Sequence, residues 1–119
     1  MYRQDFFKRA IEQLAAALAR AMGLAQSEQP AQALESLREA EGALPVVPGI
    51  LEDMDATTLL ETVGAEFAAV LAQVLALEAD LQERLGRPLL AQRPRRLSER
   101  LRAALAKGSA STGDKPGPT

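Results

Sequence analysis

The chain of 119 residues contains no cysteine, no histidine and no tryptophan. Without cysteine it can form neither a disulfide nor a thiolate metal site, and it has no thiolate nucleophile. Without histidine it lacks the most common general base near neutral pH and the most common metal ligand. Neither a P-loop nor a G-x-G-x-x-G motif is present. We therefore expect a protein that is not an enzyme, with no cofactor, no bound metal and no small-molecule substrate.

Long apolar runs are also missing. The longest, over residues 67–77, is interrupted by Gln73 and followed by Glu78, whereas a membrane-spanning helix needs about 20 apolar residues. The first five residues, Met1-Tyr2-Arg3-Gln4-Asp5, include the charged Arg3 and Asp5 and do not form the apolar core of a signal peptide. These features predict a cytoplasmic protein without a transmembrane segment.

Aromatic residues make up only 3% of the chain, yet hydrophobic residues make up 47%, and most of these are Ala and Leu. Ala and Leu are strong helix formers, whereas strands favour β-branched and aromatic residues. The composition therefore predicts an all-α fold, and the length fits a single domain with one core.

Apolar side chains recur at three- and four-residue spacing along most of the chain, which is typical of amphipathic helices. The predicted helices lie near residues 3–22, 28–42, 55–63, 65–85 and 94–106. Because the connection between the first two is short, we expect them to pack as an antiparallel hairpin. Together they form one helical domain over residues 1–107. The tail, residues 108–119, has no Leu, Ile, Val or aromatic residue, so we expect it to be disordered.

Several helix ends carry recognisable signals. Gly23 fits the left-handed position just past the end of the first helix, and Gly86 fits the same position after the fourth. The start of the third helix has two candidates. Asp55 can accept a hydrogen bond from an unpaired N–H group, or Thr58 and Glu61 can form a capping box. The sequence does not choose between them.

Charge is distributed unevenly. Residues 1–83 contain five basic and fourteen acidic side chains, whereas residues 84–107 contain eight basic side chains and one acidic. The candidate residues for binding an anionic partner are Arg93, Arg95, Arg96, Arg100 and Arg102. Four interpretations remain open: docking on the acidic helices of the same chain or of a second subunit, contact with nucleic-acid phosphates, binding to an anionic membrane surface, or binding to an acidic protein.

Two weaker motifs are present. Arg95-Arg96-Leu97-Ser98 has the form of a basic-directed phosphorylation site, although Ser98 also suits an ordinary polar helix position. Glu52, Asp53 and Asp55 could together hold a hard cation. Their spacing lacks the order of an EF-hand loop, so helix capping and solvation explain these acids better.

The first half of the chain resembles a small, uncharacterised bacterial helical family that is distantly similar to tetratricopeptide-repeat hairpins. The stretches that carry this resemblance, within about residues 4–63, are Gln4-Asp5-Phe6-Phe7, Ile11 to Arg20, Met22-Gly23-Leu24, Ala33-Leu34-Glu35-Ser36-Leu37 and Asp55 to Leu60. The resemblance implies a helical hairpin array and a protein-binding role, and it supplies no catalytic residues. The chain departs from a true repeat because an offset of 34 residues pairs Ala33 with Phe67 and Leu44 with Glu78.

Taken together, the sequence predicts an all-α bundle of four to five helices with a tetratricopeptide-like N-terminal hairpin. Its expected function is that of a non-catalytic protein–protein interaction or scaffold module, whose partner is a second copy of itself or another protein. The alternative is binding to a nucleic-acid phosphate backbone through the arginines of the predicted C-terminal helix. No aromatic residue lies between Arg84 and Lys107, so base stacking cannot contribute there.

Overall fold

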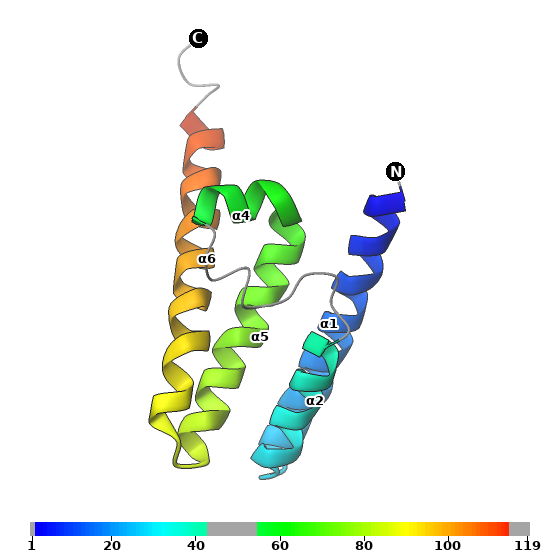
Figure 1. Cartoon of the computed structure of the whole chain (residues 1–119), viewed down its shortest axis with the longest axis vertical. Coiled ribbons are helices and arrows are strands. Elements are labelled where there is room, and N and C mark those ends of the chain that lie inside the picture. The colour runs from blue at the N-terminus through cyan, green and yellow to red at the C-terminus, as the bar shows by residue number, and fades with distance from the viewer. Residues whose placement is uncertain (1, 43–54, 115–119) are drawn as a thin grey trace.

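The computed structural model describes residues 2–42 and 55–114, and within these ranges it consists of helices without any strand (Figure 1). The prediction of an all-α fold is therefore confirmed. The helices are α1 (Tyr2–Gln26), α2 (Pro30–Gly42), α4 (Ala56–Val63), α5 (Ala65–Arg84) and α6 (Pro88–Asp114).

Helix α5 is the central element. It packs against α6 on one side and against both α1 and α2 on the other. Helix α4 lies across the first turn of α5 and contacts α6, which continues beyond it (Figure 1). Helices α1 and α2 lie side by side as a hairpin, and so do α5 and α6. A helix with neighbours on several sides must be apolar on most of its surface. The buried residues of α5 accordingly come in adjacent pairs such as Phe67–Ala68 and Leu71–Ala72.

The core is built from the predicted apolar stripes. The side chains of Leu14, Leu37, Phe67 and Leu101 are each 0% exposed, and they come from α1, α2, α5 and α6 respectively. Small residues fill the remaining contacts. Several of them are buried alanines that do not belong to the rows of larger apolar side chains: Ala10, Ala17, Ala25, Ala68, Ala72, Ala79 and Ala91. Such small side chains allow helix backbones to approach closely.

Helix α1 does not end at Gly23 as the sequence predicts, but continues to Gln26. Its end is set by Glu28, the one non-glycine residue in the described chain with a positive φ, of 60°. The N–H of Glu28 donates to the Ala25 carbonyl and the N–H of Gln29 donates to the Leu24 carbonyl, over 3.1 and 2.9 Å. This is the hydrogen-bond pattern of a Schellman cap. The extra turn buries Ala25, which offsets the cost of about 1 kcal/mol for a glycine inside a helix.

Replacing Glu28 with glycine is expected to stabilise the fold by about 0.5–1 kcal/mol, because glycine adopts a left-handed conformation without steric cost. Removing an acidic side chain near a helix C-terminus adds to the gain. Chemical denaturation of the two proteins measures the difference. Gln29→Gly is the matched control, since Gln29 is exposed and does not have a positive φ. An equal gain in the control would show that the backbone conformation of Glu28 is not responsible.

The turn between α5 and α6 agrees with the prediction for Gly86, whose φ is 78°. The N–H of Gly86 donates to the Glu83 carbonyl, and that of Arg87 donates to the Gln82 carbonyl, which completes a second Schellman cap. The predicted start of the last helix near residue 94 is wrong, because α6 already begins at Pro88. Proline is favoured in the first turn of a helix. Pro94 lies within the helix instead, where it cannot donate a backbone hydrogen bond.

The start of α4 resolves the two candidate caps in favour of Asp55. Its Oδ1 accepts from the Thr58 N–H over 2.8 Å, and its Oδ2 accepts from the Thr58 hydroxyl over 3.0 Å. These hydrogen bonds lower the pKa of Asp55. Gly64, with a φ of 87°, separates α4 from α5. Of the three acidic residues that could hold a cation, only Asp55 belongs to the described part of the chain, and Glu52 and Asp53 lie outside it.

At the C-terminal end, α6 is described through Asp114, although the sequence predicts that the helix ends at Gly108. A single glycine raises the free energy of a helix by only about 1 kcal/mol and does not by itself end one. The predicted disorder of the tail concerns residues 108–119, of which residues 115–119 lie outside the described part of the chain.

Candidate functional site

The five candidate arginines all lie on α6, but they occupy two sides of that helix. An α-helix turns about 100° per residue, so Arg93, Arg96 and Arg100 fall within roughly 60° of one another. Arg95 and Arg102 fall within about 20° of each other, roughly 140° away from the first group. The structure therefore does not bring the five residues together on a single surface.

Arg95 is engaged within the molecule. Its Nη2 lies 2.9 Å from Glu83 Oε2 and 3.5 Å from Asp80 Oδ1, and both acids belong to α5. Arg102, on the same side of α6, lines a shallow hollow together with Asp80 and Met22. The interpretation that the basic helix docks on acidic helices of its own chain thus holds for Arg95. Because these side chains are largely exposed, the ion pairs contribute at most about 1 kcal/mol.

The other side of α6 carries a stripe that mixes apolar and basic side chains. Leu89 precedes Arg93 by four residues, so it lies on the same side as Arg93, Arg96 and Arg100. We call these four residues the outer stripe. Leu89 is 76% exposed, and the adjacent Leu90 is 53% exposed. Sequence reasoning missed both leucines because it assigned residues 88–93 to a connection rather than to a helix.

Ser98 faces into the protein and not towards solvent. Its residue surface is 3% exposed, and its hydroxyl donates a 2.8 Å hydrogen bond to the Ala72 carbonyl on α5. This contact supports the interpretation of Ser98 as a structural polar residue, because a kinase cannot reach the hydroxyl in the folded protein.

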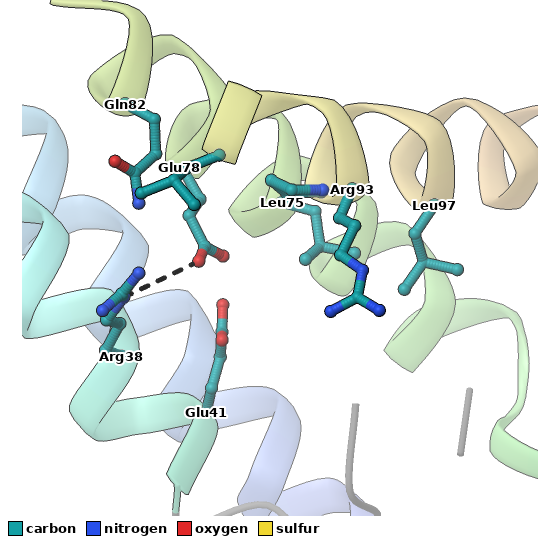
Figure 2. A pocket seen from close by; sticks show the side chains of 9 residues that line it. Arg38, Glu41, Leu75, Glu78, Gln82, Arg93 and Leu97 are labelled. Carbon is teal, nitrogen blue, oxygen red and sulfur yellow. Dashed lines mark ion pairs between the residues drawn. The ribbon is translucent and has the colours of Figure 1, made fainter. Parts of the chain in front are cut away.

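A pocket of about 250 Å³ lies where α2, α5 and α6 meet (Figure 2). Its lining consists of Arg38, Glu41, Leu75, Glu78, Gln82, Leu90, Arg93, Pro94 and Leu97. Helix α2 contributes polar residues only, whereas α5 and α6 contribute polar residues together with leucines and Pro94. Figure 2 shows the carboxyl groups of Glu41 and Glu78 pointing toward each other, with Arg38 beside them.

The two carboxyl groups are coupled. Burial, a hydrogen bond with Glu78 and the negative charge of Glu78 together raise the pKa of Glu41 to about 9. Burial is the largest of these causes, and Arg38 acts in the opposite direction. Arg38 Nε lies 4.0 Å from Glu78 Oε2, which is a weak contact for an ion pair. Glu41 is therefore protonated at neutral pH, and its proton serves the hydrogen bond between the two groups.

Three oxygen atoms of this pocket have no hydrogen-bond partner: Glu41 Oε2, Glu78 Oε1 and Gln82 Oε1. Gln82 is 1% exposed and Glu78 is 9% exposed. Buried polar atoms nearly always have a partner in native proteins. Three unpartnered acceptors in one pocket therefore mark a place where a donor would bind favourably.

The sequence contained one signal of this site. Glu78 lies four residues after Val74 and Gln82 four residues after Glu78, so both polar residues fall on the side of α5 that carries Leu71 and Val74, where core positions are expected. Polar residues at core positions need partners. What the sequence could not indicate was that Glu41, distant along the chain, lies opposite Glu78.

Two further properties bear on function. Among the described residues, no group of three or more acidic side chains has the arrangement needed to hold a metal ion. None of the described helices has the length and apolarity required to traverse a lipid bilayer.

Comparisons with known proteins do not assign the chain to a group: no family model, no curated protein and no solved structure matches it. The resemblance to tetratricopeptide-repeat hairpins stays a prediction. Since a helical fold by itself is compatible with many functions, any function must be argued from the surfaces and the pocket described above.

Proposed function

We propose that the protein is a non-catalytic interaction module that binds a protein partner through the outer stripe of α6. The observation that carries this proposal is the exposure of Leu89, at 76%, in line with three arginines. Exposed large apolar residues next to arginine are characteristic of protein interfaces, where arginine is enriched.

The charge of the outer stripe defines the partner. A protein that covers Leu89 and the exposed Arg96 binds more favourably if it presents an apolar contact surrounded by acidic groups. A second copy of the chain has this chemistry, because residues 1–83 carry a net charge of −9, and α2 exposes Glu35 and Glu39. Self-association is therefore the first form of the interaction to test. The tetratricopeptide-like character of the α1–α2 hairpin is part of this proposal and supports it by analogy alone.

Leu89→Asp is expected to weaken association at least about tenfold, because it replaces an apolar contact by a charge at the interface. Stability should change little, since the side chain is exposed. Size-exclusion chromatography with light scattering measures the mass of each variant at low and high salt. Met22→Asp is the matched control, because Met22 is also an exposed apolar residue, at 49%, but belongs to α1.

A dimer that persists at high salt, and that Leu89→Asp but not Met22→Asp converts to a monomer, supports self-association. If wild type is a monomer, the same variants serve in a cross-linking experiment with candidate acidic proteins. The proposal is wrong if Leu89→Asp and wild type behave identically in both experiments.

The spacing of Arg93, Arg96 and Arg100 on one side of α6 also keeps the nucleic-acid alternative open. Contacts to phosphates release counterions, so such binding weakens steeply with salt. Ultraviolet detection during the size-exclusion experiment distinguishes protein binding from nucleic-acid binding. Bound nucleic acid adds strong ultraviolet absorbance to a chain with one tyrosine and no tryptophan. Changing all five candidate arginines to glutamine should abolish this activity. Affinity that survives the change would refute it.

A further inference from the structure

The most unusual feature outside the outer stripe is the polar end of the pocket between α2, α5 and α6. Its three unpartnered atoms, on Glu41, Glu78 and Gln82, are all oxygen acceptors. Two of the three atoms belong to carboxyl groups. The third, Gln82 Oε1, is an amide oxygen on a nearly fully buried side chain. The polar end of this pocket is therefore rich in acceptors.

A ligand that satisfies these atoms must supply several donors from one small group. A primary ammonium group carries three N–H donors and no acceptor. Three donors match the three unpartnered oxygens in number. Its positive charge is favoured beside the two carboxyl groups, in the partly buried surroundings that strengthen such contacts.

The remainder of the lining suits an aliphatic chain attached to that group. The same pocket is lined by Leu75, Leu90, Pro94 and Leu97. Its volume of about 250 Å³ is larger than the volume that several water molecules occupy in the liquid, at about 30 Å³ each. A hydrated metal ion would gain nothing from these apolar side chains. An alkyl chain would bury its surface against them.

We propose that this pocket binds a primary ammonium group on an aliphatic chain, with the nitrogen held by Glu41, Glu78 and Gln82. Two sources provide this chemistry: a free alkylamine, or a lysine side chain of a protein bound at the surface. The site does not depend on the interaction proposed for the outer stripe, because the residues that hold the nitrogen are not part of that stripe. Arg93 is the one residue that belongs to the outer stripe and also lines the pocket.

The guanidinium groups of Arg38 and Arg93 also line the pocket and oppose a second positive charge. Arg38 is 56% exposed, and its contact with Glu78 Oε2 is long, at 4.0 Å. It can therefore move into solvent when a cation enters. Glu41 faces Arg38 on its own helix, Glu78 on α5 and Arg93 on α6 (Figure 2). A bound cation favours the ionised form of Glu41 and so releases its proton. Affinity should consequently rise as the pH increases from about 7 to about 9.

The experiment uses the full ¹⁵N-labelled chain titrated with cadaverine, and in a second arm with a short peptide that contains one lysine. Pentanol and the same peptide with norleucine in place of lysine are the matched ligands without the ammonium group. We expect backbone amide shifts around Glu41, Glu78 and Gln82 with cadaverine, the lysine peptide or both, and none with the matched ligands. The arm that binds more tightly identifies the source.

Two substitutions test the contacts. Glu41→Gln keeps the shape of the side chain but removes its capacity for negative charge, and Gln82→Met removes the amide oxygen. Each should weaken binding about tenfold or more. Glu39→Gln makes the same change in charge on an exposed residue of α2 and should leave the affinity unchanged, as should Leu89→Asp.

Three results would overturn the proposal. The first is the absence of saturable binding with both ammonium ligands. The second is equal binding by wild type, Glu41→Gln and Gln82→Met. The third is a response of the same amides to Mg²⁺ alone and not to either amine, which would identify a metal site instead. Because Leu89→Asp is expected to retain amine binding, failure here and failure of the interaction module are distinguishable.

Discussion

Leu34→Asp is expected to unfold the protein at room temperature. Leu34 is 5% exposed and belongs to the core cluster that joins α2 to α1 and α5. Shortening a buried leucine costs about 2–5 kcal/mol, and an unpaired carboxylate in the core adds several more. The sum reaches the lower half of the usual stability of a domain, which is about 5–15 kcal/mol, and small domains lie at that end of the range.

Far-ultraviolet circular dichroism during thermal and urea denaturation measures this effect. Gln32→Asp is the matched control, because Gln32 lies on the same helix but is exposed, and it should change stability by less than about 0.5 kcal/mol. A cooperative melt of Leu34→Asp that resembles wild type would show that α2 does not pack as described. If Gln32→Asp unfolded as well, the cause would be helix propensity and not burial.

The positions of the core residues were predictable from sequence because helix periodicity specifies them. Leu14, Leu37, Phe67 and Leu101 each recur at three- or four-residue spacing with other apolar residues, and each is 0% exposed. The sequence does not indicate which helix lies at the centre of the bundle. Helix α5 was expected to have one apolar stripe, but Leu75 and Ala79 are also buried, since neighbours contact the helix from several sides.

Helix ends were harder to predict because tertiary contacts compete with local signals. Gly23 has the preferences of a helix stop, but α1 continues past it. The added turn buries Ala25, and the carbonyl of Ala25 accepts a 3.2 Å hydrogen bond from Arg84 Nη1 on α5. No local pattern around Gly23 reveals a partner that lies on another helix. Pro94 likewise predicts a helix start, since a proline suits the first turn of a helix better than its interior.

The candidate site was only partly predictable. The sequence identified a basic segment correctly, but the residue-by-residue rotation of α6 separates Arg95 and Arg102 from the other three arginines. The pocket was not predicted, because Glu41 and Glu78 come from helices that meet only in the tertiary structure. The polar residues Glu78 and Gln82 on an otherwise apolar stripe were the one indication of it.

Glu41→Gln is expected to stabilise the protein at neutral and higher pH, although it removes the proposed amine-binding charge. The pKa of Glu41 rises from its ordinary value of 4.5 to about 9, with burial as the main cause. Below the ordinary pKa the carboxyl group is protonated in both the folded and the unfolded chain, so it carries no penalty. As the pH rises above that value, the unfolded chain loses the proton while the folded chain retains it. The contribution of Glu41 to stability therefore falls, at up to about 1.4 kcal/mol per pH unit, until the pH reaches the folded pKa.

Glutamine cannot ionise, and its amide can still donate to Glu78, so the variant lacks this penalty. Because Glu41 is only partly buried, we expect a gain of about 2 kcal/mol at pH 7 rather than the full linkage value. Urea denaturation of both proteins at several pH values from about 4 to 9 gives the difference as a curve that starts near zero and increases with pH. Other titrating groups cancel in this difference, and Glu39→Gln, on the exposed side of α2, should give a flat curve. Parallel stability curves for Glu41→Gln and wild type would mean that Glu41 is solvated in the folded protein. In that case the acceptor-rich pocket would not exist as described, and any loss of amine binding in this variant would need another explanation.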